Sequence, residues 1–336
     1  MRVSTIWARA IMYDSQMIIA KSRRIAVPYG ASLAGVVLSA VLAAPARAFY
    51  INPDISQTMG SDSYEGTDAS VDFGGAFHVT PSYYDYHSDL SGDVEYKTYA
   101  LRAAYDTSKF GLSIHGGYTP QPSGDHYSNR FLGVHGVLGF FPGTGKVQRL
   151  QQYHDASAAW QPWGWTPPPA GLSGFLVGAG IGYIGHKADV GGFGSPSTGS
   201  EAIGQTNLRA DASAAFFDNL LSVDLTKSIY SGNLADKGLQ PLSVEVLPGV
   251  NQEIQGFPEV SANFKLSMGM IPYVTPYIDY AHTTFDAGER PSGAYTAGCS
   301  VNLMMLSFRA YYERYVQIGQ PDQNFVGLGA ALNFQP

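Results

Sequence analysis

A short stretch of the sequence, GDHYSNR at 124–130, brings two reactive side chains close together along the chain. His126 and Ser128 are two positions apart, so on a β-strand they lie on the same face. A histidine that takes the proton of a serine hydroxyl makes that oxygen a nucleophile toward esters, provided that a third group orients the histidine. Both are candidate catalytic residues. The alternative is that they are polar residues at the rim of a strand.

A larger set of ionisable residues recurs on the polar side of an alternating pattern. Acidic and basic members are mixed, which argues against an interior that strongly selects one sign of charge. We predict that they face the interior of the fold, either as the wall of a solute path or as ion-paired layers that fill it. The predicted pore-lining residues are Asp72, His78, Arg102, His115, Arg209, Asp211, Asp224, Glu259, Lys265, Asp279, Arg309 and Glu313.

Metal and cofactor sites have no comparable signal. The eight histidines are scattered without a His-x-x-Glu-His or Cys-His cluster. The GTGK at 143–146 lacks the spacing and the strand-to-helix context of a phosphate-binding loop. We therefore expect no metal and no cofactor, and we regard the chain as more typical of a non-enzyme than of an enzyme.

The elements that would position these residues have a period of two. Within 257–282, every second residue of 260–270 is apolar and the residues between them are polar. After a short turn at Ile271-Pro272, the same pattern resumes over 274–280. Because side chains alternate between the two faces of a strand, each segment predicts a strand with one apolar and one polar face.

The alternation continues through most of the chain and predicts about twelve strands. Many segments are about 11 residues long, which matches the roughly 9–11 that cross a bilayer at a tilt, whereas ordinary strands have about 5–6. The first segment carries the apolar row Val71, Phe73, Phe77 and Val79. The predicted strands are 70–82, 95–105, 109–119, 127–141, 171–186, 207–216, 221–229, 259–270, 274–281, 295–305, 308–317 and 326–334.

The connections between these segments alternate in length. The short ones are 106–108, 217–219, 271–272 and 306–307, and the longer ones are 83–94, 120–126, 187–205, 232–256 and 286–292. Short turns at one end and long loops at the other are typical of outer-membrane barrels. Aromatic residues gather at strand ends, as membrane-interface girdles do: Tyr83, Tyr84, Tyr105, Tyr118, Phe140, Phe141, Phe216, Phe217, Tyr230 and Phe285.

With these features and the terminal VGLGAALNF, the chain resembles bacterial outer-membrane β-barrel proteins, although no single family is indicated. The resemblance covers most of 67–334 and implies an all-β, antiparallel, up-and-down transmembrane barrel. Each unpaired backbone group costs several kcal/mol in hydrocarbon, so such a sheet must close on itself. The apolar row would then face lipid and the polar row a lumen. A soluble all-β secreted domain is the alternative, because its strands also alternate.

The HYSN stretch has a resemblance of its own. It is similar to the catalytic stretch of outer-membrane lipid A deacylases, whose histidine and serine would correspond to His126 and Ser128. Outer-membrane phospholipases use a comparable His-x-Ser. The acid that the deacylases carry about twelve positions after the serine corresponds here to Phe140, which leaves the triad incomplete.

The N-terminus has the pattern of an export signal. Three basic residues, Lys21, Arg23 and Arg24, precede an apolar stretch at 31–44 and an ARA cleavage pattern at 46–48. We predict a signal peptide over 1–48, with Met17 as an alternative start, followed by a periplasmic segment at 49–66. A membrane-anchor helix is the competing interpretation, but this apolar stretch is short of the roughly 20 residues that span a bilayer.

The charge after cleavage bears on possible partners. The leader holds six basic residues and one acidic residue, so its removal makes the chain more acidic than its full-length net charge of −7. We therefore expect no nucleic-acid partner. The single cysteine, Cys299, allows no internal disulfide.

One connection, at 142–171, breaks the alternation of turn lengths. It lies on the predicted periplasmic side and holds Trp160, Trp163 and Trp165, with a possible helix over 146–159. It could be a flap at the membrane interface, a plug of the lumen or a docking element.

Together these features predict a porin or transporter that passes small solutes across the outer membrane of a Gram-negative bacterium. Expected partners are outer-membrane lipids and lipopolysaccharide, and the barrel-assembly machinery, which would engage the C-terminal strand. Two alternatives are a lipid esterase using His126 and Ser128, and a structural or adhesive barrel with a packed interior that presents the loops 187–205 and 232–256.

Overall fold

The computed structural model describes the chain in eleven segments. They are 50–89, 94–107, 109–121, 127–140, 174–189, 200–216, 219–232, 257–269, 273–286, 290–303 and 305–332. The predicted signal peptide, the insertion at 142–171 and His126 lie outside these segments. Within them, no helix has the length and apolar character needed to cross a bilayer.

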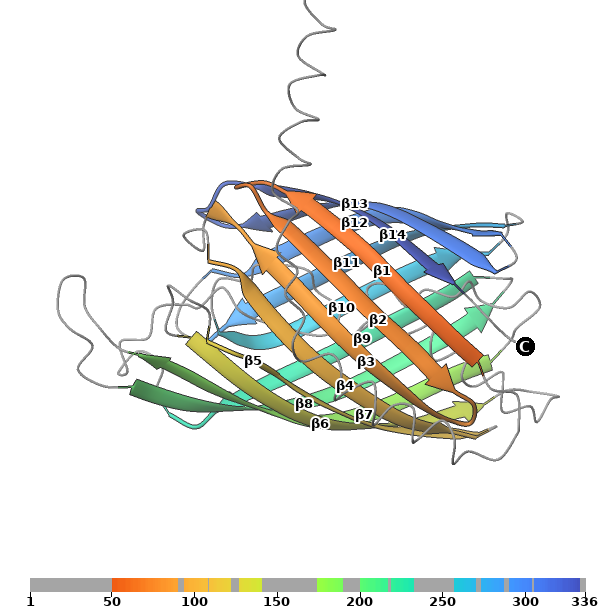
Figure 1. The fold of residues 1–336 in the computed structure, drawn as a ribbon, viewed down its shortest axis with the longest axis horizontal. Helices are drawn as coiled ribbons and strands as arrows, with labels where there is room; N and C mark the ends of the chain where they lie inside the picture. The colour runs from red at the N-terminus through yellow and green to blue at the C-terminus, as the bar shows by residue number, and fades with distance from the viewer. Residues whose placement is uncertain are drawn as a thin grey trace, which may run out of the picture. The chain divides into compact units, whose positions relative to one another are not determined.

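The described residues form fourteen strands in one closed antiparallel barrel (Figure 1). The strands are β1 (Tyr50–Gly60), β2 (Glu65–Gly74), β3 (Phe77–His87), β4 (Tyr96–Asp106), β5 (Phe110–Thr119), β6 (Tyr127–Phe140), β7 (Gly174–Asp189), β8 (Ser200–Phe216), β9 (Asn219–Tyr230), β10 (Pro258–Met268), β11 (Val274–Phe285), β12 (Ser292–Leu303), β13 (Leu306–Gln317) and β14 (Gln323–Leu332).

The first and last strands close the ring. β1 pairs with β2 along one side and with β14 along the other, where the register runs from Asp54 opposite Ala331 to Gly60 opposite Phe325. Figure 1 shows β1 beside β2, and both strands cross the near side of the barrel at a tilt. Every strand therefore has two hydrogen-bonded neighbours, so the sheet has no edge with unpaired backbone groups.

The outer face of the barrel is apolar over much of its area. Large side chains such as Leu132, Ile278 and Leu328 are exposed by 58%, 52% and 62%. Contiguous apolar surface of this kind is unfavourable in water, whereas it is what a surface in contact with lipid requires. The polar residues that alternate with them turn inward, so a polar interior replaces the hydrophobic core of a soluble domain.

The two ends of the barrel differ in their connections. Tyr50 pairs with Gly74 and Leu332 pairs with Leu306, so both ends of the barrel sequence lie beside the tight β2–β3 and β12–β13 connections. We call this the short-turn end. The opposite, long-loop end carries the connections between β7 and β8 and between β9 and β10.

The strand number corrects the sequence-based prediction of twelve. The segment 70–82 is not one strand, because a turn at Gly75-Ala76 divides it between β2 and β3. Gly74 has a φ of 145°, and a Cβ there would overlap the carbonyl oxygen of Phe77, so only glycine fits this turn. Val71 and Phe77 are nevertheless both outward, because the turn preserves the apolar row across the hairpin.

The second extra strand is β1, which occupies 50–60 of the predicted periplasmic segment 49–66. Its alternation is real, since Ile51, Ile55 and Met59 are exposed by 42%, 57% and 56% while Ser56 and Thr58 are buried. Pro53 and Gln57 occupy the outward row and obscure that pattern in the sequence. The β1–β2 turn at 61–64 is also short, with Asp62 and Ser63 at φ values of 55° and 54°.

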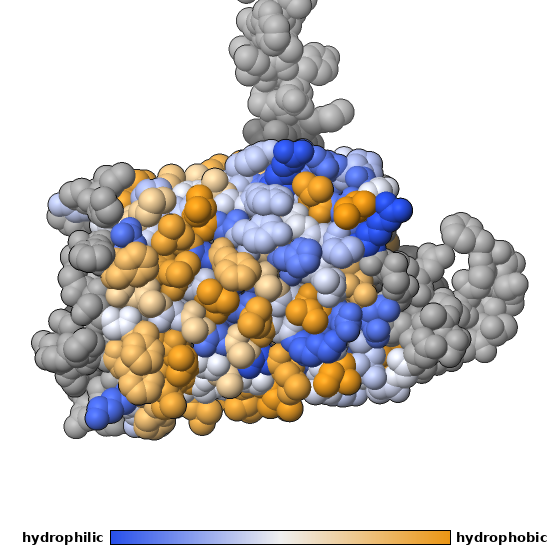
Figure 2. Space-filling model, turned by 180° about the vertical axis from the view of Figure 1, so that it is seen from behind, coloured by the Kyte–Doolittle hydropathy of each residue, from blue (hydrophilic) through white to orange (hydrophobic). Residues whose placement is uncertain are grey.

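Charged residues on the outer surface are concentrated toward the long-loop end. Figure 2 shows apolar residues over the short-turn part of one face and more polar residues toward the long-loop end. Ion pairs at this level include Lys97–Glu95 at 2.8 Å and Arg314–Asp322 at 2.5 Å. The hydrogen bond from Lys97 lowers the pKa of the Glu95 carboxyl, which lies in the β3–β4 connection.

The predicted aromatic girdles are partly outside and partly inside the barrel. Tyr105, Tyr118, Phe140 and Phe216 are exposed on the outer face by 42–49%. Tyr84, Tyr230 and Phe285 instead face inward, as their paired positions show: Tyr84 is opposite Asp68, Tyr230 opposite Gln205 and Phe285 opposite Pro258. Phe141 and Phe217 lie outside the described segments.

Candidate functional site

The candidate site is the inner wall of the barrel. Eleven of the twelve predicted pore-lining residues occupy inward positions, spread over β2, β3, β4, β5, β8, β9, β10, β11 and β13. They are Asp72, His78, Arg102, His115, Arg209, Asp211, Asp224, Lys265, Asp279, Arg309 and Glu313.

Glu259 is the exception, and its predicted inward position is wrong. The β10–β11 register shifts between Pro258 and Val260, so Glu259 is the extra residue of a β-bulge. Its carboxylate contacts Lys227 at 2.6 Å, and both side chains are more than 40% exposed. Lys227 stands on the outward row of β9 between Leu225 and Ile229, so this pair belongs to the outer surface. Strict alternation fails here because a bulge turns one side chain to the other face.

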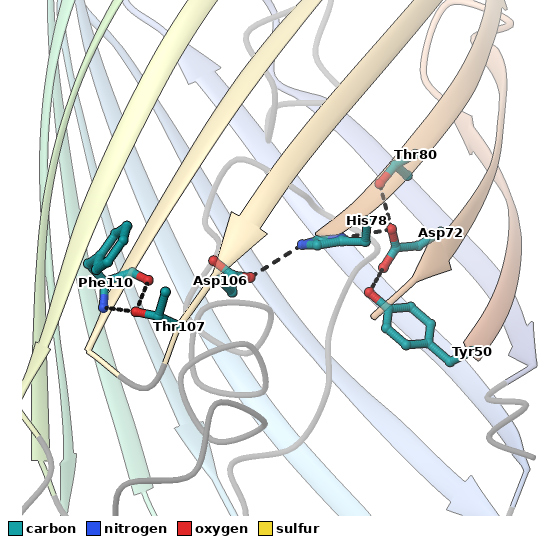
Figure 3. Close-up of polar contacts among 7 residues, drawn as sticks. All are labelled: Tyr50, Asp72, His78, Thr80, Asp106, Thr107 and Phe110. Carbon is teal, nitrogen blue, oxygen red and sulfur yellow. Dashed lines mark hydrogen bonds and ion pairs between the residues drawn. The ribbon is translucent and has the colours of Figure 1, made fainter. Parts of the chain in front are cut away.

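A histidine held between two carboxylates lies at the short-turn end (Figure 3). His78, which is 1% exposed, has Nδ1 at 3.0 Å from Asp72 and Nε2 at 3.2 Å from Asp106. To donate from both nitrogens to ionised carboxylates, the imidazole must carry a proton on each. Tyr50 and Thr80 each donate a hydrogen bond of 2.8 Å to Asp72. The cluster therefore joins four neighbouring strands, β1 to β4, through charge-assisted hydrogen bonds.

A second cluster spans β6, β8 and β9 near the middle of the barrel. His135 Nε2 lies 2.5 Å from Asp211, and Arg209 ion-pairs with Asp224 and lies 3.8 Å from Asp211. Two acids and two bases thus satisfy one another in one connected group. Within a wall of low dielectric constant, such pairing offsets the free energy that is lost when charges leave water.

The wall formed by β1, β10, β11 and β13 holds two further pairs. Arg309 donates a hydrogen bond to Asp54, and the two strands lie on either side of β14. Lys265 is directly opposite Asp279 in the β10–β11 register. Its ammonium also lies 5.3 Å from the ring centroid of Tyr277, within the range of a cation–π contact.

Glycines on neighbouring strands let the large inward side chains lie along the wall. A Cβ at Gly327 would overlap the Tyr311 ring, and one at Gly133 would be 2.5 Å from the His115 ring. A Cβ at Gly178 would similarly overlap the Asp211 carboxylate. Each glycine removes a side chain from the space that its neighbour covers. The long side chains are thereby held against the sheet.

Several inward residues escaped the sequence analysis. Asp54 was missed because β1 was not recognised, and Asp68 because the first predicted strand began only at residue 70. Asp106 was missed because it lies just past the predicted end of 95–105. His135 lies in a predicted strand, opposite Gly180 on β7, and the alternation with Val134 marks it as inward. For His135, the alternation in the sequence was therefore sufficient to predict its inward position.

Of the two catalytic candidates, Ser128 alone lies in the described segments. Ser128 is on the outward row of β6 near the long-loop end, opposite Lys187 of β7. Phe140, at the position where the deacylases carry their acid, faces outward at the other end of β6 and stacks on Phe175 at 4.5 Å. His126 lies outside the described segments, so the pairing of His126 with Ser128 stays a prediction. No group of three or more metal-ligating side chains occurs in those segments.

Comparisons with known proteins concern the fold. No protein-family model and no curated protein matches the chain. Among solved structures it is similar to CdiB from Acinetobacter baumannii, with 8% identity, a TM-score of 0.43 and coverage of 86% of this chain and 60% of CdiB. CymD, a monoaromatic hydrocarbon channel, has 9% identity, a TM-score of 0.44 and coverage of 86% and 89%.

The outer-membrane protein opdK from Pseudomonas aeruginosa is a third similar structure, with 9% identity, a TM-score of 0.36 and coverage of 86% of this chain and 99% of opdK. Each of these likenesses has a TM-score below 0.5, and the closed fourteen-strand barrel is established by the strand pairing of this chain itself. At these identities the likeness carries no information about a solute.

Proposed function

We propose that the chain is an outer-membrane channel that passes small solutes through the interior of its barrel. The observation that carries this proposal is the division of the strands into an apolar outer row and an ionisable inner row. The closed ring leaves no unpaired backbone for lipid to cover, and the inner row supplies polar contacts to a solute. The export signal predicted over 1–48 supports the same location.

The inner row also supports a preference for cations. Carboxylates at inward strand positions outnumber lysines and arginines in the described segments. The acids are Asp54, Asp68, Asp72, Asp106, Asp211, Asp224, Asp279 and Glu313, and the bases are Arg102, Arg209, Lys265 and Arg309. The protonated His78 offsets one more of these carboxylates, which still leaves more acidic than basic groups on the inner wall. An excess of negative charge raises the local concentration of cations.

Two partner classes belong to this proposal. The charged outer residues near the long-loop end lie at the level where lipopolysaccharide and lipid head groups would contact the barrel. The C-terminal strand β14, which closes the ring against β1, is the element that we expect the barrel-assembly machinery to engage.

Permeation into proteoliposomes tests the function. The mature chain is refolded into liposomes, and swelling rates are measured with neutral, cationic and anionic solutes of matched size. We expect faster swelling than in protein-free liposomes and a higher rate for the cation than for the anion. Rates equal to those of protein-free liposomes for every solute would refute the channel and favour a barrel with a packed interior.

A further inference from the structure

A series of buried and partly buried aromatic side chains lies on the inner face of the barrel at its long-loop end. We call it the aromatic collar, and it comprises Tyr64, Tyr86, Tyr96, Tyr127, Phe257 and Phe325. Each belongs to a strand end or connection on the long-loop side. The middle of the barrel, by contrast, is lined mainly by the ionisable groups described above.

One half of the collar runs from β14 to β4. The Phe325 ring meets the Tyr64 ring edge-on at 5.3 Å, and Tyr64 is stacked with Tyr86 at 6.3 Å. Tyr86 in turn stacks on Tyr96 at 5.3 Å with an interplanar angle of 19°. These separations are those of favourable aromatic pairs. The four rings therefore contact one another in succession around the wall.

The other half runs from β4 to the start of β10. Tyr96 and Tyr127 pack in one buried cluster, and the Tyr127 ring lies 6.0 Å from the ring of His186. Phe257 meets His186 edge-on at 6.1 Å and Tyr230 at 5.5 Å. The collar thus extends over most of the inner circumference at the mouth.

The collar is dry. Tyr127, Phe325, Tyr96 and Phe257 are exposed by only 0–4%. The polar atoms beneath it bond to each other: Tyr127 donates to His186 Nδ1 at 2.7 Å, and His186 Nε2 donates to Gln205 at 2.8 Å. A histidine that accepts at one nitrogen and donates at the other is neutral. His186 therefore adds no charge that would draw a hydrated ion through the aromatic layer.

Because the collar rings are largely buried, a solute can contact them only where it displaces one ring from its neighbour and takes its place. A flat aromatic ring can do so by stacking, whereas a polyol or a hydrated inorganic ion would lose hydrogen bonds to water without replacement. Below the collar, the excess of inward carboxylates favours positive charge. An aromatic surface also attracts cations through the faces of its rings.

We propose that the collar is the selectivity element of the channel and that its substrates are small molecules carrying both an aromatic ring and a positive charge. This inference rests on the proposed channel function and names its substrate class. The collar supplies the preference for the ring, and the carboxylates of the inner wall supply the preference for the charge.

The test compares two organic cations that differ only in the ring. Benzyltrimethylammonium and its saturated counterpart, cyclohexylmethyltrimethylammonium, have the same charge and nearly the same size. Reversal potentials of the refolded full-length mature chain in planar bilayers, with one ion on each side, give their permeability ratio. We expect a preference of about fivefold for the aromatic ion, as one stacking interaction provides. Benzenesulfonate, an aromatic anion, is expected to permeate less than either.

Collar variants make the test specific. Tyr86→Leu with Tyr96→Leu keeps large apolar side chains but removes a stacked pair, so the ratio should fall toward one; Tyr86→Leu alone serves if the double variant does not fold. Tyr99→Leu is the matched control, because Tyr99 stacks with Tyr118 on the outer face, and it should keep the ratio.

The results of these experiments distinguish the role of the collar from the channel function. A wild-type ratio near one, or a ratio that the collar variants leave unchanged, overturns the role of the collar while the channel stands. If neither cation carries current through any variant that is folded and inserted, the substrate class fails. The channel function fails with it only if the same protein also leaves the swelling rates of liposomes unchanged for every solute.

Discussion

At the scale of single residues, the inner wall is organised by short-range pairing of charges. His78 between Asp72 and Asp106 is the most buried example, with its side chain inaccessible to solvent. The residue types and their inward positions follow from alternation in the sequence. The hydrogen-bond partners of these residues cannot be predicted from alternation, because the register of β2, β3 and β4 brings Asp72 and Asp106 to His78.

Removal of His78 tests this cluster. His78→Ala leaves two buried carboxylates without the cation between them, and we expect the free energy of unfolding to fall by about 3 kcal/mol. Urea titration of the refolded barrel in detergent measures the change. His87→Ala is the control, because His87 is well exposed and lies 3.8 Å from Glu65, so it should cost roughly 0.5 kcal/mol or less. Equal effects of the two variants would contradict the role given to His78.

Glycine positions under large side chains give a second prediction at this scale. Gly327→Ala would place a methyl group inside the space of the Tyr311 ring, which must leave the wall and lose its 2.7 Å hydrogen bond with Thr58. We expect a loss of about 2 kcal/mol in unfolding free energy. Gly182→Ala is the matched control, because its nearest neighbours are at 3.7 Å and it should be close to neutral. A Gly327→Ala barrel as stable as the wild type would show that Tyr311 does not depend on this glycine.

At the scale of elements, sequence periodicity locates strands well where both rows are regular and fails where the rows are interrupted. β10 is found within two residues at each end and β11 from its first residue, because their apolar rows are unbroken, although β11 continues past the predicted end at 281 to Phe285. β1 is missed because Pro53 and Gln57 interrupt its outward row, and β2 merges with β3 because the turn between them spans only two residues. The bulge at Glu259 is equally invisible, since one extra residue shifts the face without changing composition.

The assignment of β1 to the barrel can be tested directly. Its backbone bonds to β2 and to β14, so its amides should exchange with deuterium as slowly as those of β2 in lipid nanodiscs. Gln57→Pro removes a backbone donor within a strand that is paired on both sides and should prevent closure or cost about 3 kcal/mol.

The control for this variant is Gly232→Pro, because Gly232 is exposed and lies just beyond the end of β9, so a proline there should be tolerated. Rapid exchange over 50–60, together with a well-folded Gln57→Pro barrel, would restore the interpretation of this segment as a periplasmic tail.

At the scale of the whole molecule, the closed ring separates two environments. The sequence predicts this division, the even strand number and the short-turn end, because all three depend only on the alternation and on the connection lengths. The aromatic collar could not be predicted in the same way, since aromatic residues at strand ends occur on both faces and only the register shows which rings meet. The proposed path of the solute, past the collar and along the acidic inner wall, follows from that division.

Modification of neighbouring cysteines on one strand tests the path most directly. In a Cys299→Ser background, Thr226→Cys places a thiol on the inward row of β9, and Leu225→Cys places one on the outward row, where Leu225 is 47% exposed. A bulky cationic methanethiosulfonate reagent is added while solute flux through the barrel in a bilayer is recorded. The account predicts that modification at Thr226→Cys reduces the flux severalfold and that Leu225→Cys is unaffected. Equal responses at the two positions would contradict a path through the interior.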